Sequence, residues 1–442
     1  MKQKLTMYSI VSCIVIMSFL NACRKTDVPV ILIPQPKVTD VISSGSSPLA
    51  ATTVPKDARI YDVGTGAGEL LIDGKSMKVD ANILVRIKAG TYNTINIKNI
   101  LAPNGFTVFI KNSGQVRVKE RMSTENISNV IIAGDNSPDI TYGFLFENIP
   151  FRAITMNGKM ERVTLSSMSF KNIKDYVIAG ENSNGKNFLY KGTDGTRTNR
   201  FKILNCLFDN AGQIIFGGNL YKNSGEDSGL FKDVEIAYNI FRNTEAGTVC
   251  AFTNVQNYDV HHNVVNNINR QNNNHNGVFY MQGNGKFHDN KLTNYQGNAI
   301  RMWLYSRGTT PATSEIYNNV CYNTRKYSGF ELQGFDRNII PGKTTFSNAK
   351  VYNNTVGKMN TSKDWEGQLL DLYNFGGSLE YYNNLGFNLN ASNGSQPKSM
   401  INNMSDTKLV RNTNNRYETE KNAVVDLVKF TSKIQGVGAT LN

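Results

Sequence analysis

The sequence predicts an all-β fold, a right-handed parallel β-helix, because two phrases recur along it. The first phrase reads IAYNIF, VHHNVV, FHDNKL, IYNNVC, VYNNTV and YYNNLG, and its fourth residue is Asn239, Asn263, Asn290, Asn319, Asn354 and Asn384. The second reads GTVCAF, GVFYMQ, GNAIRMW, GFELQ and GQLLDLY, from Gly247, Gly277, Gly297, Gly329 and Gly367. A period of about 20–50 residues indicates a solenoid, and apolar residues two apart indicate strands.

Each coil is therefore expected to hold three short strands: a Gly-led strand, a strand entering the Asn and a strand leaving it. Asn tolerates the left-handed backbone region better than most residues, so we expect the repeated Asn to adopt it at the turn. Asn side chains stacked from coil to coil can pair their amide groups inside that turn. Met168 and Cys206 occupy the same position in two upstream coils.

The repeats between residues 80 and 390 resemble those of the pectate-lyase-like superfamily. This resemblance implies the same fold. It implies no single activity, because lyases, hydrolases, epimerases and adhesins share that fold.

The start of the chain is predicted to be a lipoprotein signal peptide, residues 1–22. Lys2 and Lys4 precede a largely apolar run at 8–20 that is short for a membrane span. The run ends in LNAC, which resembles the lipobox of bacterial lipoproteins and implies acylation of Cys23. We therefore expect an exported outer-membrane lipoprotein, on the periplasmic or the cell-surface side. The alternative is an ordinary secretory signal in which Cys23 is incidental.

Three further segments follow. Residues 23–57 hold the lipidated Cys and a Pro/Ser-rich tether, 58–399 form the β-helix, and 400–442 form a C-terminal cap over the final rung. The remaining cysteines, Cys206, Cys250 and Cys321, stand at different positions of the repeat, so no disulfide framework is expected.

The Gly-led strands are predicted to carry the functional face. If Val249, Phe279, Ile300, Phe330 and Leu370 point inward, the residues that alternate with them point outward. One outward column is Cys250, Tyr280, Arg301, Glu331 and Asp371, and the next is Phe252, Gln282, Trp303, Gln333 and Tyr373. Loops before the strands add His275, Arg325, Lys326 and Trp365. Because aromatic rings stack on sugar faces, we interpret Tyr280, Gln282, Trp303, Arg325, Gln333, Trp365 and Tyr373 as binding residues of a polysaccharide cleft. Alternatively, the rings only pack loops against the solenoid.

The charged column leaves three interpretations open. Arg301, Glu331 and Asp371 could be a solvated ion-pair ladder. In a glycoside hydrolase, Glu331 and Asp371 would serve as acid and nucleophile. In a lyase, the two carboxylates could hold Ca²⁺ and Arg301 could neutralise a uronate carboxylate, while His275 or Lys326 abstracts the C5 proton. No other cofactor is expected.

A second, local resemblance bears on this column. The stretch NYQGNAIRMW, from Asn294, is similar to the segment that bears a catalytic Arg in the lyase family of chondroitinase B and alginate lyases. Arg301 stands one place off when the stretch is aligned on Gln296 and Gly297, and Gln282 stands near that family's Lys. The resemblance therefore transfers no catalytic role residue by residue.

The four histidines lie between His261 and His288 and suggest a metal cluster. However, His261 and His288 share one outward position on the Asn-entering strands, followed there by Tyr317, Tyr352 and Tyr382. We expect a stacked ladder of rings on a sheet remote from Arg301, since a zinc site needs three or four converging ligands.

Charge favours an anionic partner. The chain has 48 basic and 35 acidic residues, a formal net charge of +13, which attracts anionic polymers at low salt. We expect a monomer that meets an acidic polysaccharide and a membrane, through its lipid anchor, but no nucleic acid. The preferred hypothesis is a lyase that cleaves a uronate-containing glycan, and its rivals are a non-catalytic glycan-binding or adhesion protein and a hydrolase.

The lipobox gives the first testable prediction. Cys23→Ser removes the thiol that would be acylated, so the protein should move from the membrane to the soluble fraction. Fractionation followed by immunoblotting measures this. An unchanged membrane fraction in the variant would refute the lipid anchor.

Overall fold

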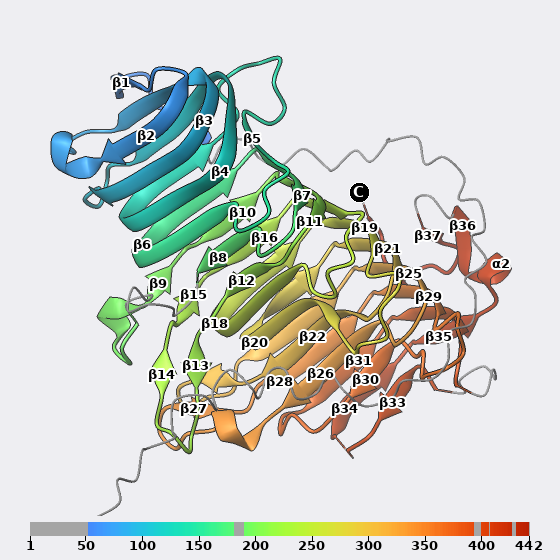
Figure 1. The fold of residues 1–442 in the computed structure, drawn as a ribbon. Helices are drawn as coiled ribbons and strands as arrows, with labels where there is room; N and C mark the ends of the chain where they lie inside the picture. The colour runs from blue at the N-terminus through green and yellow to red at the C-terminus, as the bar shows by residue number, and fades with distance from the viewer. Residues whose placement is uncertain (1–51, 181–189, 393–398, 406, 427–429, 442) are drawn as a thin grey trace, which may run out of the picture. The chain divides into compact units, whose positions relative to one another are not determined.

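The structure, a computed structural model, describes residues 52–180, 190–392, 399–405, 407–426 and 430–441. These belong to one compact unit, Ser44–Asn442 (Figure 1). The predicted signal peptide, Cys23 and nearly all of the tether lie outside the described residues.

The N-terminal coils are built from long bent strands. They are β1 (Arg59–Val63), β2 (Ala67–Asp73), β3 (Ile83–Leu101), β4 (Val108–Ala133), β5 (Phe144–Glu147) and β6 (Ile154–Ser166), with a 3₁₀ turn at Gly74–Ser76. Strand β3 pairs in parallel with β1, β2 and β4. At its bend, Gly90 has φ +148° and a Cβ there would lie 2.0 Å from the Gly66 oxygen. Only glycine lets these two coils approach so closely.

From residue 168 onward the coils contain three separate parallel sheets (Figure 1). The Gly-led sheet contains β8 (Ile178–Gly180), β12 (Ile214–Phe216), the first parts of β18 (Cys250–His261) and β20 (Gly277–His288), β22 (Asn298–Leu304), β26 (Phe330–Gly334), β30 (Leu370–Leu372) and β33 (Ile401–Asn403).

The entering sheet holds the strands that lead into the Asn. It contains β10 (Lys202–Leu204), β16 (Glu235–Ala237), the last parts of β18 and β20, β24 (Thr313–Tyr317), β28 (Asn348–Tyr352), β31 (Leu379–Tyr382) and β34 (Leu409–Thr413).

The leaving sheet completes each coil. It contains β7 (Met168–Ile173), β11 (Leu207–Ala211), β17 (Ile240–Arg242), β19 (Val264–Ile268), β21 (Lys291–Tyr295), β25 (Val320–Thr324), β29 (Thr355–Met359), β32 (Leu385–Leu389) and β35 (Arg416–Glu418). The predicted parallel β-helix is confirmed.

Excursions from the coils form shorter elements. They are β13 (Asn219–Leu220), β14 (Asp227–Ser228), β23 (Ser306–Arg307), β27 (Thr344–Thr345), α2 (Glu420–Ala423), β36 (Val424–Asp426) and β37 (Thr431–Ser432). The strands among them form three antiparallel pairs outside the solenoid sheets, β13–β14, β23–β27 and β36–β37. The first two pairs belong to long connections beside the Gly-led sheet. Two other short strands, β9 (Thr198–Asn199) and β15 (Phe231–Lys232), instead belong to the solenoid, where they pair in parallel with each other and with β6 and β18.

Inward-facing residues of successive coils fill the core in columns. Phe146, Phe170, Phe208 and Phe241 stack face to face with ring centroids 4.8, 5.0 and 4.7 Å apart. These distances match the spacing of strands in a sheet, because each coil contributes one ring. The stack buries large apolar areas, which is the main stabilising contribution of a solenoid core.

The predicted Asn ladder is present and fully buried. Asn319 is typical: its Oδ1 accepts from the backbone N–H and the Nδ2 of Asn290, 3.0 and 3.1 Å away. Its own N–H and Nδ2 donate to Asn354 Oδ1, and Nδ2 also donates to the Phe287 carbonyl. The same pattern runs from Asn239 to Asn415.

One detail of the turn differs from the prediction. The left-handed residue is the one before the ladder Asn: φ is +58° at Tyr238, +52° at His262, +54° at Asp289 and +53° at Asn318. The ladder Asn itself must keep its side chain inside the solenoid. The residue that reverses the chain therefore precedes it.

The predicted ring ladder is also present on the entering sheet. His261, His288, Tyr317, Tyr352 and Tyr382 stack with centroid distances of 5.0, 4.5, 5.0 and 5.0 Å and interplanar angles of 10° or less. Arg411 continues it, with its guanidinium carbon 3.5 Å from the Tyr382 ring centroid.

The C-terminal segment differs from the cap predicted at 400–442. Strands β33, β34 and β35 form one more coil, so the solenoid continues to Glu418. The chain then runs back along earlier coils: Gly438 N–H donates to the Asn383 carbonyl, and Ala439 N–H donates to Thr355 Oγ1. Buried Phe430 and Ala439 pack on Val320 of the leaving sheet. The repeat phrase weakens in the last coil, which is why its strands escaped prediction.

Two further observations concern the described residues. None of their helices is long and apolar enough to cross a membrane. Cys206, Cys250 and Cys321 are buried free thiols. The amide of Cys206 donates to Asn239 Oδ1 at 2.9 Å, so Cys206 occupies the ladder position that the sequence assigned to it.

The ladder gives the second prediction. Asn319→Leu removes the acceptor of the Asn290 N–H and of one Asn290 Nδ2 hydrogen, and it removes the side-chain donor to the Phe287 carbonyl. Each unpaired buried group costs about 1–3 kcal/mol. We expect the free energy of unfolding to fall by at least about 3 kcal/mol. Urea denaturation measures it.

The matched control is the same substitution at Asn223, an exposed residue in the turn between β13 and β14. Asn223→Leu should change the free energy of unfolding by less than about 0.5 kcal/mol. Equal effects of the two substitutions would show that the ladder is not what stabilises the coils.

Candidate functional site

The site lies on the outer side of the Gly-led sheet, where β20, β22, β26 and β30 run side by side (Figure 1). Strand pairing places Tyr280, Arg301, Glu331 and Asp371 in one column, as the sequence predicted, and Asn402 follows them. Gln282, Trp303 and Gln333 form the next outward column.

Two residues assigned to these columns belong elsewhere. Cys250 pairs with Phe279 and Phe252 with Met281, so both face the core, and Ala251 stands in the Tyr280 column. The prediction took Val249 as the inward residue that matches Phe279. The pairing of Cys250 with Phe279 shows that the assignment was one residue off in this strand.

Arg301, Glu331 and His275 form the centre of the site. Arg301 Nε donates to Glu331 Oε1 at 2.8 Å, and Arg301 Nη1 donates to the His275 carbonyl at 2.9 Å. His275 Nε2 lies 3.0 Å from Glu331 Oε2. The exposed fraction is 0% for the Glu331 side chain, 18% for Arg301 and 25% for His275.

Glu331 is thus a buried anion between two partners. Burial alone would raise the pKa of its carboxyl group, but His275 and Arg301 together hold that pKa below the ordinary value. A carboxylate enclosed in this way stays charged and fixes the position of both partners. The interpretation as a solvated ion-pair ladder does not describe this arrangement.

Asp371, the next residue of the column, is also buried, but no cationic side chain of the described residues forms an ion pair with it. Its oxygens accept from Nδ2 of Asn298 and of Asn402, both at 3.3 Å, and from the Ser328 hydroxyl. Burial and the neighbouring negative charge of Glu331 raise the pKa of Asp371 to about 6. The two adjacent carboxyl groups therefore lose their protons in different pH ranges: Asp371 near pH 6 and Glu331 at lower pH.

A loop residue outside the predicted set of site residues, Tyr327, packs on His275. Its ring stacks on the His275 ring with centroids 4.2 Å apart and an interplanar angle of 13°. Trp365 lies edge-on to Tyr327 at 5.6 Å and is 46% exposed. Lys326 lies over both rings and pairs with Asp364 at 3.2 Å. The sequence signal for Tyr327 is its place in the loop directly before a Gly-led strand, next to Arg325 and Lys326.

Arg325, predicted to bind substrate, instead holds the loop that carries His275. Its guanidinium donates to the Asn273 side chain at 2.8 Å and to the Asn272 carbonyl. The Tyr327 hydroxyl donates to the Asn273 carbonyl at 3.0 Å. Burial lowers the pKa of Arg325, which is consistent with a structural position. The loops before β20 and β26 therefore form one unit.

Trp303, predicted to stack on sugar, is half-buried in a second cluster. Tyr280 and Phe335 meet the indole edge-on at 4.9 and 4.3 Å. The guanidinium carbons of Arg301 and Arg337 lie 5.9 and 5.3 Å from its ring centroid. The ring is thus largely occupied by the protein itself, and Trp365 is the more accessible tryptophan.

The remaining predicted binding residues have distinct surroundings. Gln282 donates to the Tyr280 hydroxyl at 2.6 Å, and Gln333 pairs with Trp303 in the strand register. Tyr373 follows β30 and is half-buried; burial and the charges of Glu331 and Asp371 raise its pKa to about 12. Its hydroxyl therefore stays protonated at neutral pH beside the charged column.

The carboxylates were also predicted to hold Ca²⁺, and the surroundings do not fit that ion. Calcium requires six to eight oxygen ligands, whereas the Glu331 and Asp371 oxygens face nitrogen atoms of Arg301, His275, Asn298 and Asn402. We therefore derive no step through a metal at this site.

A hollow adjoins the site. It has a volume of about 330 Å³, is open to solvent, and is lined by Lys174, Asp175, Tyr176, Gln213, Thr248 and Asn276, among others. Asn276 follows His275 directly. The polar surface therefore continues from the Arg301 column toward earlier coils, which suits an extended ligand.

Comparison with known proteins adds little beyond the fold. No family model matches the chain, and no curated protein matches it. Among solved structures, the chain is similar to a PL6 family polysaccharide lyase from Pseudopedobacter saltans, with 12% identity and a TM-score of 0.43, over 84% of this chain and 99% of that chain. It is also similar to the Agl-KA catalytic domain, with 12% identity and a TM-score of 0.30, over 76% and 63% of the two chains. We draw no argument about the reaction from likenesses this distant.

The pKa of Asp371 gives the third prediction. Because its pKa is higher in the folded state, the folded protein binds more protons than the unfolded chain between pH 4 and 6. This contribution to stability is therefore present at low pH and is lost as the pH rises through 6. The change in the free energy of unfolding caused by Asp371→Asn should therefore depend on pH. It should be more stabilising at pH 7 than at pH 4, by roughly 1–3 kcal/mol. Urea denaturation of both proteins at the two pH values tests this, and a difference that does not vary with pH would contradict it.

Proposed function

We propose that this protein is a polysaccharide lyase that cleaves an acidic, uronate-containing glycan at the Arg301 column. The observation that carries the proposal is the setting of Arg301. Glu331 and the His275 carbonyl take up one side of its guanidinium. Those two hydrogen bonds use Nε and Nη1. Within the described residues Nη2 makes no hydrogen bond, so a planar carboxylate could bind there.

His275 is the proposed base. Its Nε2 lies 2.8 Å from Asn298 Oδ1 and 3.0 Å from Glu331 Oε2, so the proton on this ring belongs on Nε2. Nδ1 is then the nitrogen with a free lone pair. A base fixed by a carboxylate in this manner keeps one tautomer and one orientation. The backbone of the same residue positions Arg301, so the cation and the base move together.

The proposed step is a β-elimination. Arg301 neutralises the uronate carboxylate, which makes the C5 proton more acidic. His275 Nδ1 takes that proton, the C5–H electron pair forms the C4–C5 double bond, and the C4–O bond breaks. The leaving oxygen takes a proton from Tyr373, whose hydroxyl stays protonated at neutral pH, or from Lys326. One unsaturated end and one new hydroxyl end result.

Binding over a longer stretch is assigned to Trp365, the polar hollow at Asn276 and the net positive charge. An exposed indole offers a flat face to a sugar ring. A formal net charge of +13 concentrates an anionic polymer at the surface. An exported, lipid-anchored protein would meet such a polymer outside the cytoplasm.

The hydrolase alternative is less well supported. A retaining hydrolase needs two carboxyl groups that both reach the glycosidic bond. Glu331 and Asp371 are only 0% and 2% exposed, so neither carboxyl group is open to a substrate at the surface. A non-catalytic glycan binder would need the aromatic surface but not the enclosed Glu331–His275 pair.

The fourth prediction tests this proposal. Arg301→Gln removes the positive charge and should lower kcat/KM on the active glycan by about 10²–10³-fold, because the charge stabilises the transition state. The assay measures unsaturated products by absorbance over a panel of polyuronates and glycosaminoglycans, with reducing ends measured in parallel.

Arg411→Gln is the matched control, since Arg411 lies on Tyr382 of the entering sheet. It should leave kcat/KM unchanged. Reducing ends without unsaturated products would indicate a hydrolase. Binding that depends on Trp365, in a protein that turns over none of the glycans, would indicate a binder.

A further inference from the structure

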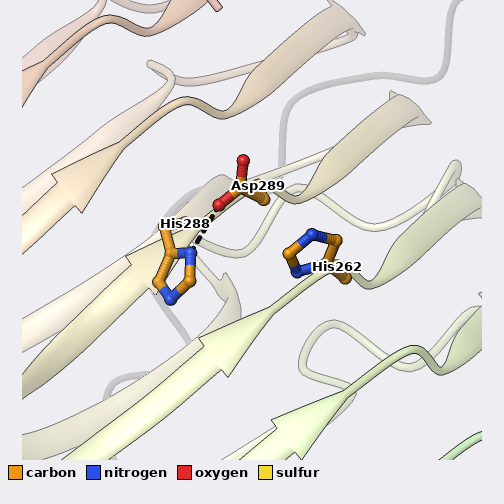
Figure 2. A group of neighbouring side chains, drawn as sticks. All are labelled: His262, His288 and Asp289. Atoms are coloured by element: carbon orange, nitrogen blue, oxygen red, sulfur yellow. Dashed lines mark hydrogen bonds and ion pairs between the residues drawn. The ribbon is translucent and has the colours of Figure 1, made fainter. Parts of the chain in front are cut away.

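A second cluster of functional side chains lies on the turn between the entering and leaving sheets. His262, His288 and Asp289 come from two neighbouring coils, at the ends of β18 and β20. Figure 2 shows His262 facing the hydrogen-bonded pair of His288 and Asp289. None of the three belongs to the Gly-led sheet, so this cluster is separate from the Arg301 column.

The repeat shows that these residues are a local exception. The left-handed position before the ladder Asn is Asn318, Asn353 and Asn383 in the later coils, but His262 and Asp289 here. The position before that is Tyr317, Tyr352 and Tyr382 in the later coils, but His261 and His288 here. Two adjacent coils thus replace both the amide and the phenol by groups that can bind a metal.

The geometry brings three ligand atoms together. One ligand atom from each of His262, His288 and Asp289 lies within 4.8 Å of the others. His288 Nδ1 and Asp289 Oδ2 are 2.6 Å apart. All three side chains are half-buried, so an ion could still reach them from solvent.

Surrounding groups already fix the rings. His288 Nε2 lies 2.8 Å from Asp259 Oδ1, and His262 Nδ1 lies 2.8 Å from His261 Nδ1. Tyr238 stacks on His262 at 4.8 Å. A histidine that binds a metal usually donates its other ring N–H to a carboxylate or similar group. These contacts therefore leave His288 Nδ1 and His262 Nε2 as the ligand atoms.

We propose that His262, His288 and Asp289 bind a divalent transition metal ion of the Zn²⁺ class. Imidazole nitrogen and carboxylate oxygen suit this class better than Ca²⁺ or Mg²⁺. Three protein ligands leave a fourth position for water, as in open zinc sites. The ion takes the place of the proton between His288 Nδ1 and Asp289 Oδ2, and that proton leaves to solvent.

The alternative is a proton-sharing network that only links two coils. Asp259, Asp289 and the His288 ring would form such a network. Burial lowers the pKa of His288, but the two carboxylates outweigh burial and raise that pKa to about 9. Such a network needs no metal. Two measurements distinguish the metal site from the proton-sharing network: whether metal binds, and whether binding depends on His262, which lies outside that network.

The fifth prediction is that the full chain, without a histidine tag, binds Zn²⁺ at this cluster. Calorimetric titration with ZnCl₂ and metal analysis after dialysis measure the binding. The wild type should bind one equivalent. His262→Gln and Asp289→Asn should each weaken binding at least tenfold, because each removes a ligand. His261→Gln removes only an orienting contact, so it should weaken binding less than either ligand substitution does.

His275→Gln is the matched control, because it removes a histidine from the Gly-led face. It should bind Zn²⁺ as the wild type does. Circular dichroism should show that each variant is folded. Unchanged binding in His262→Gln, or loss of binding in His275→Gln, would overturn the proposal, as would the absence of saturable binding in the wild type. Lyase activity has no part in this test, so it is independent of the proposed function.

Discussion

The structure depends on the buried hydrogen-bonded column of asparagines. Each Oδ1 accepts two N–H groups from the preceding coil, and each Nδ2 reaches both the following Asn and a carbonyl of the preceding coil. Since these groups are cut off from water, moving one coil against the next by a single residue would leave several of them unpaired. The ladder therefore fixes one register for all three sheets.

A fixed register makes functional columns possible. Arg301, Glu331 and Asp371 are separated by 30 and 40 residues in the chain, yet the strand pairing places them side by side. The loops between the ladders can vary in length without disturbing this, because both ends of each loop are held by paired strands. The loops before β20 and β26, tied together by Arg325 and Tyr327, use this freedom to cover the column.

The same logic explains what the sequence could and could not predict. Period-two alternation and the repeated Asn were sufficient for the three sheets, the Asn ladder and the stacked rings of His261 to Tyr382. Alternation also placed Arg301, Glu331 and Asp371 outside the core. It could not show that loops bury the two carboxylates, because alternation reports which side of a strand a residue is on and nothing about what lies above it.

The individual errors have local causes. The left-handed conformation was assigned to the ladder Asn because Asn tolerates it, but the preceding residue adopts it, even where that residue is Tyr238 or His262. The covering of Trp303 depends on Arg337, in a long excursion without periodicity. Arg325 looked like a ligand-binding cation because nothing in the sequence reports its contacts with Asn272 and Asn273.

The energetics of the charged column indicate that it is retained for a reason other than stability. Burying an ion pair rarely gains free energy over apolar packing, and a second buried carboxyl group beside it adds a cost. The fold does not require these charges, since Tyr280 and Asn402 occupy the same column on adjacent coils. Asp371 has a raised pKa and Glu331 a lowered one within the same small region. Opposed pKa shifts in adjacent groups are characteristic of functional sites. Because the Asn ladder already fixes the register of the solenoid, the fold can tolerate the unfavourable free energy of burying these charged groups on the Gly-led sheet.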